Sequence, residues 1–216
     1  MSRQYPDGAV PAGVRRRRRA TPAALPVDFY ARPSDAVARE LLGCIIEREI
    51  DGVRCTAEIV EAEAYLGPHD EASHAAARFG RTPRNEVMFG PPGHAYVYLI
   101  YGMHWCMNAV TDVDGFPSGV LLRAAWPREG LQTMRGHRPG RSDEELLRGP
   151  GNLCRALGID RSLYGHDLSR PPLRILPGSS IPDERVATGP RIGVTRAVDD
   201  PLRFWVRDCP AVSGSR

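Results

Sequence analysis

The sequence predicts a single α+β domain, built mostly from antiparallel hairpins with helices grouped around them. Alternating hydrophobic segments follow one another across short turns, and Asp51-Gly52 is the strongest of the hairpin signals. The length of 216 residues allows one domain with a substantial core and is short for two. No internal repeat is visible in the sequence.

The first half of the chain predicts a helix, a hairpin and a long loop. The helix begins at Ser34 and ends at Gly43, a residue type that commonly stops helices. Alternation predicts strands at 44–50 and 53–65. The segment 66–94 is rich in Gly, Pro, His and Arg and is predicted to be a loop. A loop of this length inside a compact domain is typical of a functional segment.

The second half of the chain continues with strands and then helices. The expected elements are strands at 95–101, 105–110 and 119–125, helices at about 129–136, 142–148 and 152–157, and closing strands at 191–194 and 202–206.

Composition places the chain among ordinary globular proteins, with 42% hydrophobic and 25% charged residues. No apolar run is long enough to span a membrane, and the N-terminus lacks the pattern of a secretory signal. We therefore expect a cytoplasmic protein, associated with the nucleoid if it is bacterial. The five cysteines are scattered and never spaced as C-x-x-C, which argues against a disulfide framework and a zinc cluster.

The positive charge is concentrated in the N-terminal tail. All 29 basic residues are Arg, and the formal net charge is +3. Residues 1–27 carry a net charge of +5 and the remainder −2, so any nucleic-acid surface must be a local patch of Arg. The tail, with Arg15 to Arg19, is predicted to be disordered because it offers little apolar surface. It is either a DNA-tethering arm or a solvated tail.

The segment V-E-A-E-A-Y-L-G-P at 60–68 holds the first candidate for chemistry. Strand alternation places Glu61, Glu63 and Tyr65 on one face. A carboxylate at a strand end beside an aromatic ring acts as a general base if its pKa is raised by burial. The alternative is a solvated edge-strand glutamate or a structural ion pair, and the pattern alone favours this alternative.

The following loop resembles a metal site only superficially. It contains His69, Asp70, Glu71 and His74 in the order H-D-E-x-x-H, which differs from the H-E-x-x-H of zinc hydrolases. The preceding Pro68 also disfavours the helix that such a site needs. We expect no metal and no cofactor.

Three tyrosines mark the segment from 96 to 103. Alternation places Tyr96 and Tyr98 on one face and Tyr101 at the hairpin tip. An exposed aromatic ring at a tip is suited to fill the gap that a flipped nucleotide leaves in a base stack. Tyr98 is suited to stacking on a base in a pocket. The alternative is that tyrosines are simply good strand residues.

Six segments together, in order along the chain, resemble the alkyladenine (3-methyladenine) DNA glycosylase family. They are V-E-A-E-A-Y-L-G-P at 60–68, R-T-P-R-N at 81–85 with Met88 and Phe89 following, A-Y-V-Y-L-I-Y-G-M at 95–103, V-L-L-R-A at 120–124, G-P-G-N-L-C at 149–154 and P-L-R-F-W-V at 201–206. The resemblance spans roughly residues 28–212. It implies a domain at 28–212, a C-terminal tail at 213–216, a curved antiparallel sheet and a protruding hairpin that intercalates into DNA.

The resemblance also implies an activity and its residues. The expected protein is a monomeric, monofunctional glycosylase of base excision repair. It flips damaged purines (3-methyladenine, 7-methylguanine, hypoxanthine or ethenoadenine) out of double-stranded DNA and hydrolyses the N-glycosidic bond. Glu63 is implied as the general base and Arg123 as its partner in holding the water. The implied DNA contacts are Tyr65, His74 and Tyr98 around the base, Asn108 against a guanine amino group, Tyr101 as the intercalating wedge, and Arg84, Met103 and His104.

Two departures from the family pattern concern DNA contacts. His104 stands where another aromatic residue is common, and Asn152 stands where a Lys is expected. If position 152 meets a phosphate, that contact is weakened.

Three other classes of function were weighed. A DNA-damage sensor without catalysis conflicts with the presence of Glu63 and Arg123. A zinc deaminase is excluded because the sequence lacks H-x-E with P-C-x-x-C. An RNA-processing domain on a related fold stays open.

Overall fold

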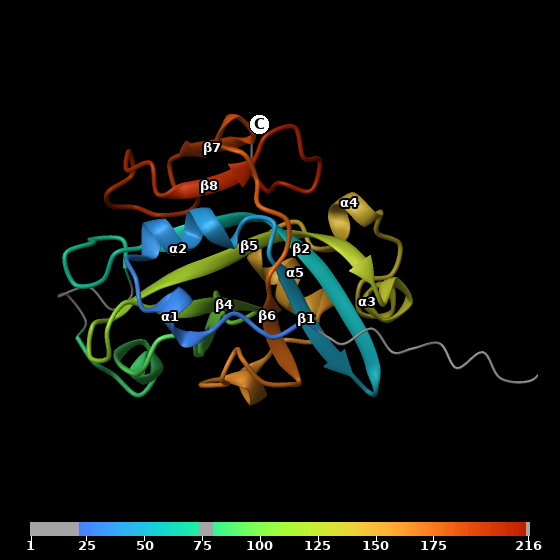
Figure 1. The fold of residues 1–216 in the computed structure, drawn as a ribbon, viewed down its shortest axis with the longest axis horizontal. Helices are drawn as coiled ribbons and strands as arrows, with labels where there is room; N and C mark the ends of the chain where they lie inside the picture. The colour runs from blue at the N-terminus through green and yellow to red at the C-terminus, as the bar shows by residue number, and fades with distance from the viewer. Residues whose placement is uncertain (1–21, 74–79, 215–216) are drawn as a thin grey trace, which may run out of the picture.

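The computed structural model describes residues 22–73 and 80–214 and confirms the α+β fold (Figure 1). One curled antiparallel sheet runs in the order β3-β4-β5-β2-β1-β6, and β8 joins it by pairing with both β2 and β7. Its strands are β1 Ile45–Ile50, β2 Val53–Tyr65, β3 Ala95–Ile100, β4 His104–Thr111, β5 Ser118–Glu129, β6 Leu173–Leu176, β7 Val186–Gly189 and β8 Arg203–Val206.

The helices of the described residues are short and lie around this sheet. They are α1 Val27–Tyr30, α2 Ser34–Leu41, α3 Leu131–His137, α4 Asp143–Leu146 and α5 Pro150–Ala156, with 3₁₀ turns η1 Glu86–Phe89, η2 Arg161–Leu163 and η3 Asp183–Arg185. α2 packs on β2 and β5, and α5 packs on β4 and β5. In Figure 1, β7 and β8 form the upper edge, with α2 just below them. No helix in the described ranges is long and apolar enough to cross a membrane.

The long strand β2 organises the sheet. Its first half pairs with β1, its second half with β8, and β5 runs along its other edge. The pairing of β2 with β5 is irregular: Ile59 pairs with Ala125, but Glu61 pairs with Ala124 and Ala62 with Leu122. Such bulges bend a strand and redirect its side chains. The last third of β2 therefore carries its carboxylates into the space between β5 and β8.

Most predicted elements are confirmed within a few residues, but three differences matter. The predicted strand at 191–194 is wrong, because this segment bends and its backbone serves the candidate site described below. The four-residue strands β6 and β7 were missed, since segments this short carry too little alternation to be recognised. The predicted loop 66–94 contains the turn η1.

Leu25 and Ser213, which lie just outside the predicted domain 28–212, both pack against it. Leu25 is buried, and its backbone N–H donates to the carbonyl of Ile175 at 2.8 Å, so order begins before residue 28. Ser213, predicted to be part of a tail, is only 6% exposed and hydrogen-bonds to buried charged groups. The Arg15–Arg19 block lies outside the described residues.

Gly43 lies two residues after the end of α2, where the chain turns. Its φ is +86°, and a Cβ at this position would lie 2.0 Å from the carbonyl oxygen of Ser179. Gly52 in the β1–β2 turn also has a left-handed φ, +77°, but its Cβ would meet nothing within 4 Å. We expect Gly52→Ala to cost about 1 kcal/mol from backbone strain and Gly43→Ala at least about 3 kcal/mol, because a backbone clash is added. Urea denaturation of both variants measures this, and equal losses would contradict the clash.

Candidate active site

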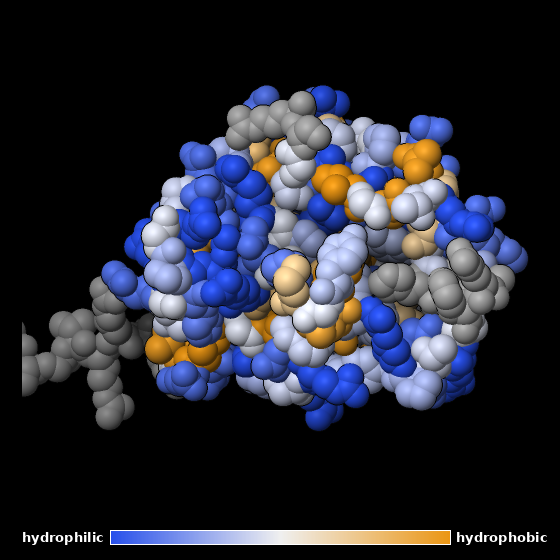
Figure 2. Space-filling model, turned by 180° about the vertical axis from the view of Figure 1, so that it is seen from behind, coloured by the Kyte–Doolittle hydropathy of each residue, from blue (hydrophilic) through white to orange (hydrophobic). Residues whose placement is uncertain are grey.

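A cavity of about 500 Å³ lies where β2 ends beside β3, β4 and β5. Its walls come from the end of β2, the loop after it, the β3–β4 hairpin, β5 and the segment 192–196. Figure 2 shows the rear face of the molecule, which is hollowed near its middle and carries several small hydrophobic patches rather than one broad one. The size suits a small aromatic ligand rather than a macromolecular chain.

Glu63 lies directly beneath the cavity wall. Its side chain is fully buried and accepts hydrogen bonds from the backbone N–H of Ile192 at 2.7 Å and the Tyr65 hydroxyl at 3.1 Å. Arg123 Nη1 lies 3.2 Å from Glu63 Oε1. Glu63 does not itself line the cavity, but these three partners do. One of these partner residues therefore lies between the carboxylate and any ligand in the cavity.

Burial controls the protonation of this site. Loss of water raises the pKa of Glu63 above its ordinary value, and Arg123, the Ile192 N–H and the Tyr65 hydroxyl offset only part of the rise. A carboxylate with a raised pKa is a stronger base than a solvated one. Burial also raises the pKa of the Cys106 thiol in the cavity wall to about 11, so this cysteine is a neutral thiol at pH 7.

Arg123 lies at a bulge in β5 and faces both glutamates. Its neighbours Leu122 and Ala124 pair with Ala62 and Glu61, so Arg123 is the extra residue between two consecutive pairs. By strand alternation Arg123 shares a face with Leu121, the partner of Glu63, so it lies on the side of the two glutamates. There its Nε contacts Glu61 at 3.2 Å and its Nη1 contacts Glu63.

Aromatic rings and one amide form the sides of the cavity. Tyr65, Tyr96 and Tyr98 line it, and the rings of Tyr96 and Tyr98 stack with centroids 4.8 Å apart. Asn108 also faces the cavity, and its buried Oδ1 has no hydrogen-bond partner among the described residues. The walls therefore offer flat π surfaces, and the Asn108 Oδ1 beside them is an acceptor that the described part of the chain leaves unpaired.

A buried ion pair, missed in the sequence, fixes two walls of the cavity to each other. Arg191 donates to Asp70 at 2.5 and 2.8 Å, and their side chains are 0% and 1% exposed. Its guanidinium also lies 4.8 Å above the Tyr65 ring. Asp70, considered above only for a metal site, instead holds the segment that presents the Ile192 N–H to Glu63. No local sequence pattern indicates this pair, because the partners are 121 positions apart.

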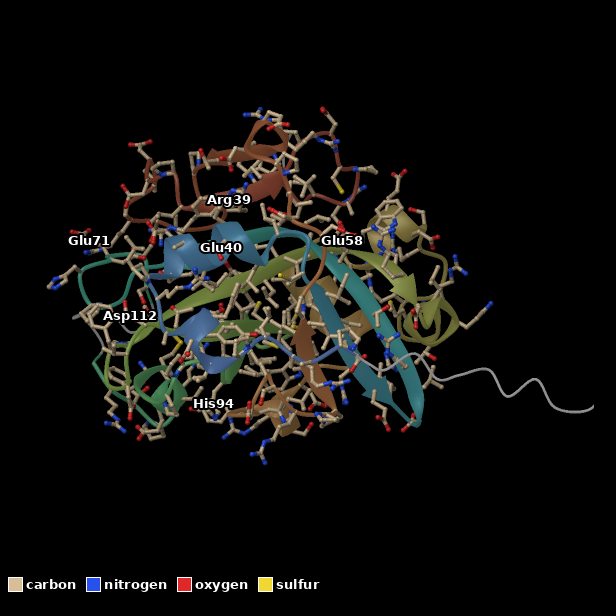
Figure 3. The ribbon with its side chains drawn as sticks, in the orientation of Figure 1. Arg39, Glu40, Glu58, Glu71, His94 and Asp112 are labelled. Atoms are coloured by element: carbon tan, nitrogen blue, oxygen red, sulfur yellow. The ribbon has the colours of Figure 1, made fainter. Side chains whose placement is uncertain are left out.

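At the cavity mouth, Glu71 and Arg196 form a more exposed pair, 3.7 Å apart. Figure 3 labels Glu71 on the loop after β2, at the edge of the molecule. Among the described residues, no group of three or more His, Cys, Asp or Glu side chains is arranged to hold a metal ion. His74, part of the candidate metal motif and of the expected base pocket, lies outside the described residues.

The β3–β4 hairpin carries the remaining predicted residues. Tyr101 and Met103 at its tip are 77% and 71% exposed, and His104 is exposed beside them. Tyr101 has a φ of +52°, an uncommon conformation for a large residue. Arg84 donates to the Leu99 carbonyl at 2.7 Å, so it braces the hairpin.

Asn152, one of the two departures from the family pattern, uses its side-chain amide within the fold. Its Nδ2 donates to the carbonyl of Arg148 at 2.6 Å, and the residue is half-buried.

The profile of the methylpurine-DNA glycosylase family matches residues 28–210. The chain belongs to this family. A relative from Myxococcus xanthus is 51% identical over 88% of this chain and 93% of its own length. Relatives from Methanocella arvoryzae and Carboxydothermus hydrogenoformans are 47% and 45% identical over 88% of this chain, covering 95% and 98% of their lengths. Each of the three carries the name "Putative 3-methyladenine DNA glycosylase". Membership makes the chain a DNA glycosylase with DNA as its substrate, and confirms the resemblance found in the sequence.

The Arg191–Asp70 pair of this glycosylase predicts a pH-dependent stability. Burial alone would raise the Asp70 pKa, but Arg191 and the N–H groups of Leu66 and Ala72 hold it below its ordinary value. The unfolded chain therefore binds the proton more tightly than the folded protein. The stabilisation is complete above the unfolded pKa of about 3.9 and is lost as the pH falls through the lower folded pKa.

Asp70→Asn tests this dependence. At pH 7 the free energy of unfolding should fall by about 3 kcal/mol, because Arg191 is left buried without its counter-charge. The difference from wild type should narrow below about pH 4, as measured by urea unfolding at stepwise lower pH. Glu86→Gln, which breaks an exposed pair with Arg81, is the control and should change stability little. A difference that stays constant with pH would contradict the assignment.

Proposed function

We propose that this glycosylase flips a damaged purine out of duplex DNA into the cavity and hydrolyses its N-glycosidic bond, with Glu63 activating the water. The observation that carries the proposal is a buried carboxylate with a raised pKa, held by three residues that line an aromatic cavity. The family supports DNA glycosylase chemistry. The names of the relatives support 3-methyladenine as one substrate, and we extend the class to 7-methylguanine, hypoxanthine and ethenoadenine.

The aromatic walls explain the preference for damaged purines. Bases with an alkylated ring nitrogen can carry positive charge, which the faces of Tyr65 and Tyr98 attract by about 0.5–2 kcal/mol. A positively charged base is also the better leaving group. Unpairing a damaged base costs less than unpairing an intact one, which adds to the selectivity. Asn108 contacts the edge of the base and hinders a guanine amino group, and its Oδ1 in the cavity wall, unpaired within the described ranges, supports this role.

The chemical step follows from the position of Glu63. The bond between the sugar C1′ and the base nitrogen breaks, and its electron pair leaves with the base. The electron-poor sugar that remains is stabilised by the nearby carboxylate. A water molecule adds to C1′, and its proton passes to Glu63. Arg123, fixed beside Glu63, orients the water. The products are the free base and an intact strand with an abasic site.

The hairpin supplies the wedge. Tyr101 enters the base stack and fills the gap left by the flipped nucleotide, while Met103 and His104 contact the neighbouring backbone and bases. Arg84 contacts a phosphate near the hairpin. The high exposure of Tyr101 and Met103 supports this role, because two neighbouring large side chains at the hairpin tip are free to enter a base stack.

Glu63→Gln tests the base. The amide cannot accept the proton, so release of hypoxanthine or 3-methyladenine from a duplex should fall at least about 100-fold. Binding to the same duplex should stay near wild type, because the cavity walls are unchanged. Glu58→Gln is the matched control, since Glu58 lies on the same strand in an ion pair with Arg128 but away from the cavity (Figure 3). Full activity of Glu63→Gln in a base-release assay would remove Glu63 from the mechanism.

Tyr101→Ala tests the wedge. Loss of the ring should raise the Kd for a lesion-containing duplex about tenfold, because one stacking contact disappears. Val53→Ala, at an exposed residue at the start of β2, should leave the Kd unchanged. Fluorescence anisotropy with a labelled duplex measures both values. Equal affinities for wild type and Tyr101→Ala would refute the assignment.

A further inference from the structure

Glu61, two residues before the proposed base, is a fully buried carboxylate with three donors. Its Oε1 accepts from Arg203 Nε at 2.7 Å and from Arg123 Nε at 3.2 Å, and its Oε2 accepts from the Ser213 backbone N–H at 2.6 Å. These donors come from β8, β5 and the C-terminal segment. Glu61 does not line the cavity, and of its three donors only Arg123 does, whereas all three partners of Glu63 line it.

The guanidinium of Arg123 is divided between two carboxylates. Its Nε edge faces Glu61, while Nη1 faces Glu63 at 3.2 Å. The Ser213 hydroxyl accepts from Nε and Nη2 at 3.3 and 3.2 Å. Because the guanidinium is planar and rigid, contacts along one edge fix the direction of the opposite nitrogen. Glu61 and Ser213 therefore determine how Arg123 approaches Glu63.

We propose that Glu61 is a positioning residue for the hydrolysis: it holds Arg123 by its Nε edge and shares the positive charge, so that Glu63 stays a strong base. The inference rests on the proposed function of Glu63. Without Glu61, the full charge of Arg123 would act on Glu63 alone and favour the ionised carboxylate. A carboxylate stabilised in this way accepts a proton from water less readily.

The effects of the neighbouring charges on the Glu63 pKa have the sign that the proposal requires. Glu61 raises the Glu63 pKa through like-charge repulsion, whereas Arg123 lowers it. Other titratable or charged groups also face Glu63 in the described part of the chain. They are Tyr65 on its own strand, Tyr98 on β3, Cys106 on β4, Arg191 at the start of the 191–196 segment and Arg203 on β8. Of these groups, Arg203 binds Glu61 directly at 2.7 Å, so a substitution at Glu61 also changes its contacts.

Two variants separate charge from position. Glu61→Gln removes the charge and keeps the size of the side chain. Glu61→Asp keeps the charge but shortens the side chain, so the carboxylate must withdraw from at least one of its three donors. Thermal melts establish that each variant is folded. Where Glu61→Gln does not fold, Glu61→Asp decides the outcome.

The first measurement is the titration of Glu63 in the free, full-length enzyme. Carbon-13 labelling of the glutamate carboxyls lets NMR follow each pKa, and the Glu63 signal is identified by its loss in Glu63→Gln. We expect Glu61→Gln to lower the Glu63 pKa by at least about half a unit, and Glu61→Asp to leave it near wild type. An unchanged Glu63 pKa in Glu61→Gln overturns the proposal.

The second measurement is the single-turnover rate of base release against pH. In Glu61→Gln the acid limb should move to lower pH with Glu63, and the plateau should fall at least about fivefold because the base is weaker. Glu61→Asp should lose at least about fivefold at the plateau, because Arg123 is displaced, with its acid limb in place. A full rate in Glu61→Asp overturns the positioning role.

The matched control is Glu47→Gln. Glu47 is also a buried carboxylate between two arginines, Arg54 and Arg174, but it lies on β1 away from the cavity. This variant should lose thermal stability while the Glu63 pKa and the rate stay unchanged. The same change in Glu47→Gln would show general loosening and overturn the proposal. If wild type releases no base, the proposed function fails, whereas the titration still decides whether Glu61 controls Glu63.

Discussion

The site depends on one constraint: a carboxylate buried away from bulk solvent must be surrounded by donors. Glu63 is fully buried, and an unpaired charge at that depth would cost several kcal/mol. The fold meets the constraint with donors from three separate places: Arg123 from β5, Tyr65 from its own strand and the backbone of Ile192. Each donor must itself be held, and the rest of the site serves that purpose. Glu61 and Ser213 hold Arg123, and the Arg191–Asp70 pair holds the segment that carries Ile192.

Departures from regular structure lie at two of these donors. β5 bulges at Arg123, the residue that contacts both glutamates. A regular strand at 191–194 would commit the Ile192 N–H to a neighbouring strand, whereas the bend leaves it for Glu63. Both irregularities lie beside the cavity, and the regular hairpin at Asp51-Gly52 lies at the other end of β2. Irregular backbone is thus placed where the side chains and N–H groups of the site are needed.

The features of the fold and the site that could be predicted are those with a local sequence pattern. The features that could not be predicted depend on residues far apart in the chain. The hairpins were predictable because alternation and a tight turn are local, and the shared face of Glu61, Glu63 and Tyr65 followed from a period of two. The partners of these residues come from remote strands and loops. Arg191 and Asp70 are 121 positions apart, and Ser213 and Glu61 are 152 positions apart. Neither contact can therefore be recognised from the sequence of one segment alone. The resemblance to a family supplied the roles of Glu63 and Arg123, but it did not show that Arg123 is shared.

The ion pair between Glu63 and Arg123 raises the question whether Glu63 serves only to stabilise the fold. A glutamate paired within solid packing would be a stabilising element only, and the pattern alone favoured that interpretation. Solid packing around such a pair would give it no ligand to act on. Here each of the three groups that bind Glu63 also forms part of a cavity wall, so a ligand in the cavity contacts the carboxylate's partners directly. Pairing and catalysis are then compatible, because Arg123 is not committed to Glu63 alone. Its Nε edge is bound to Glu61 and Ser213, which leaves the carboxylate less neutralised than an unshared guanidinium would, and therefore more basic.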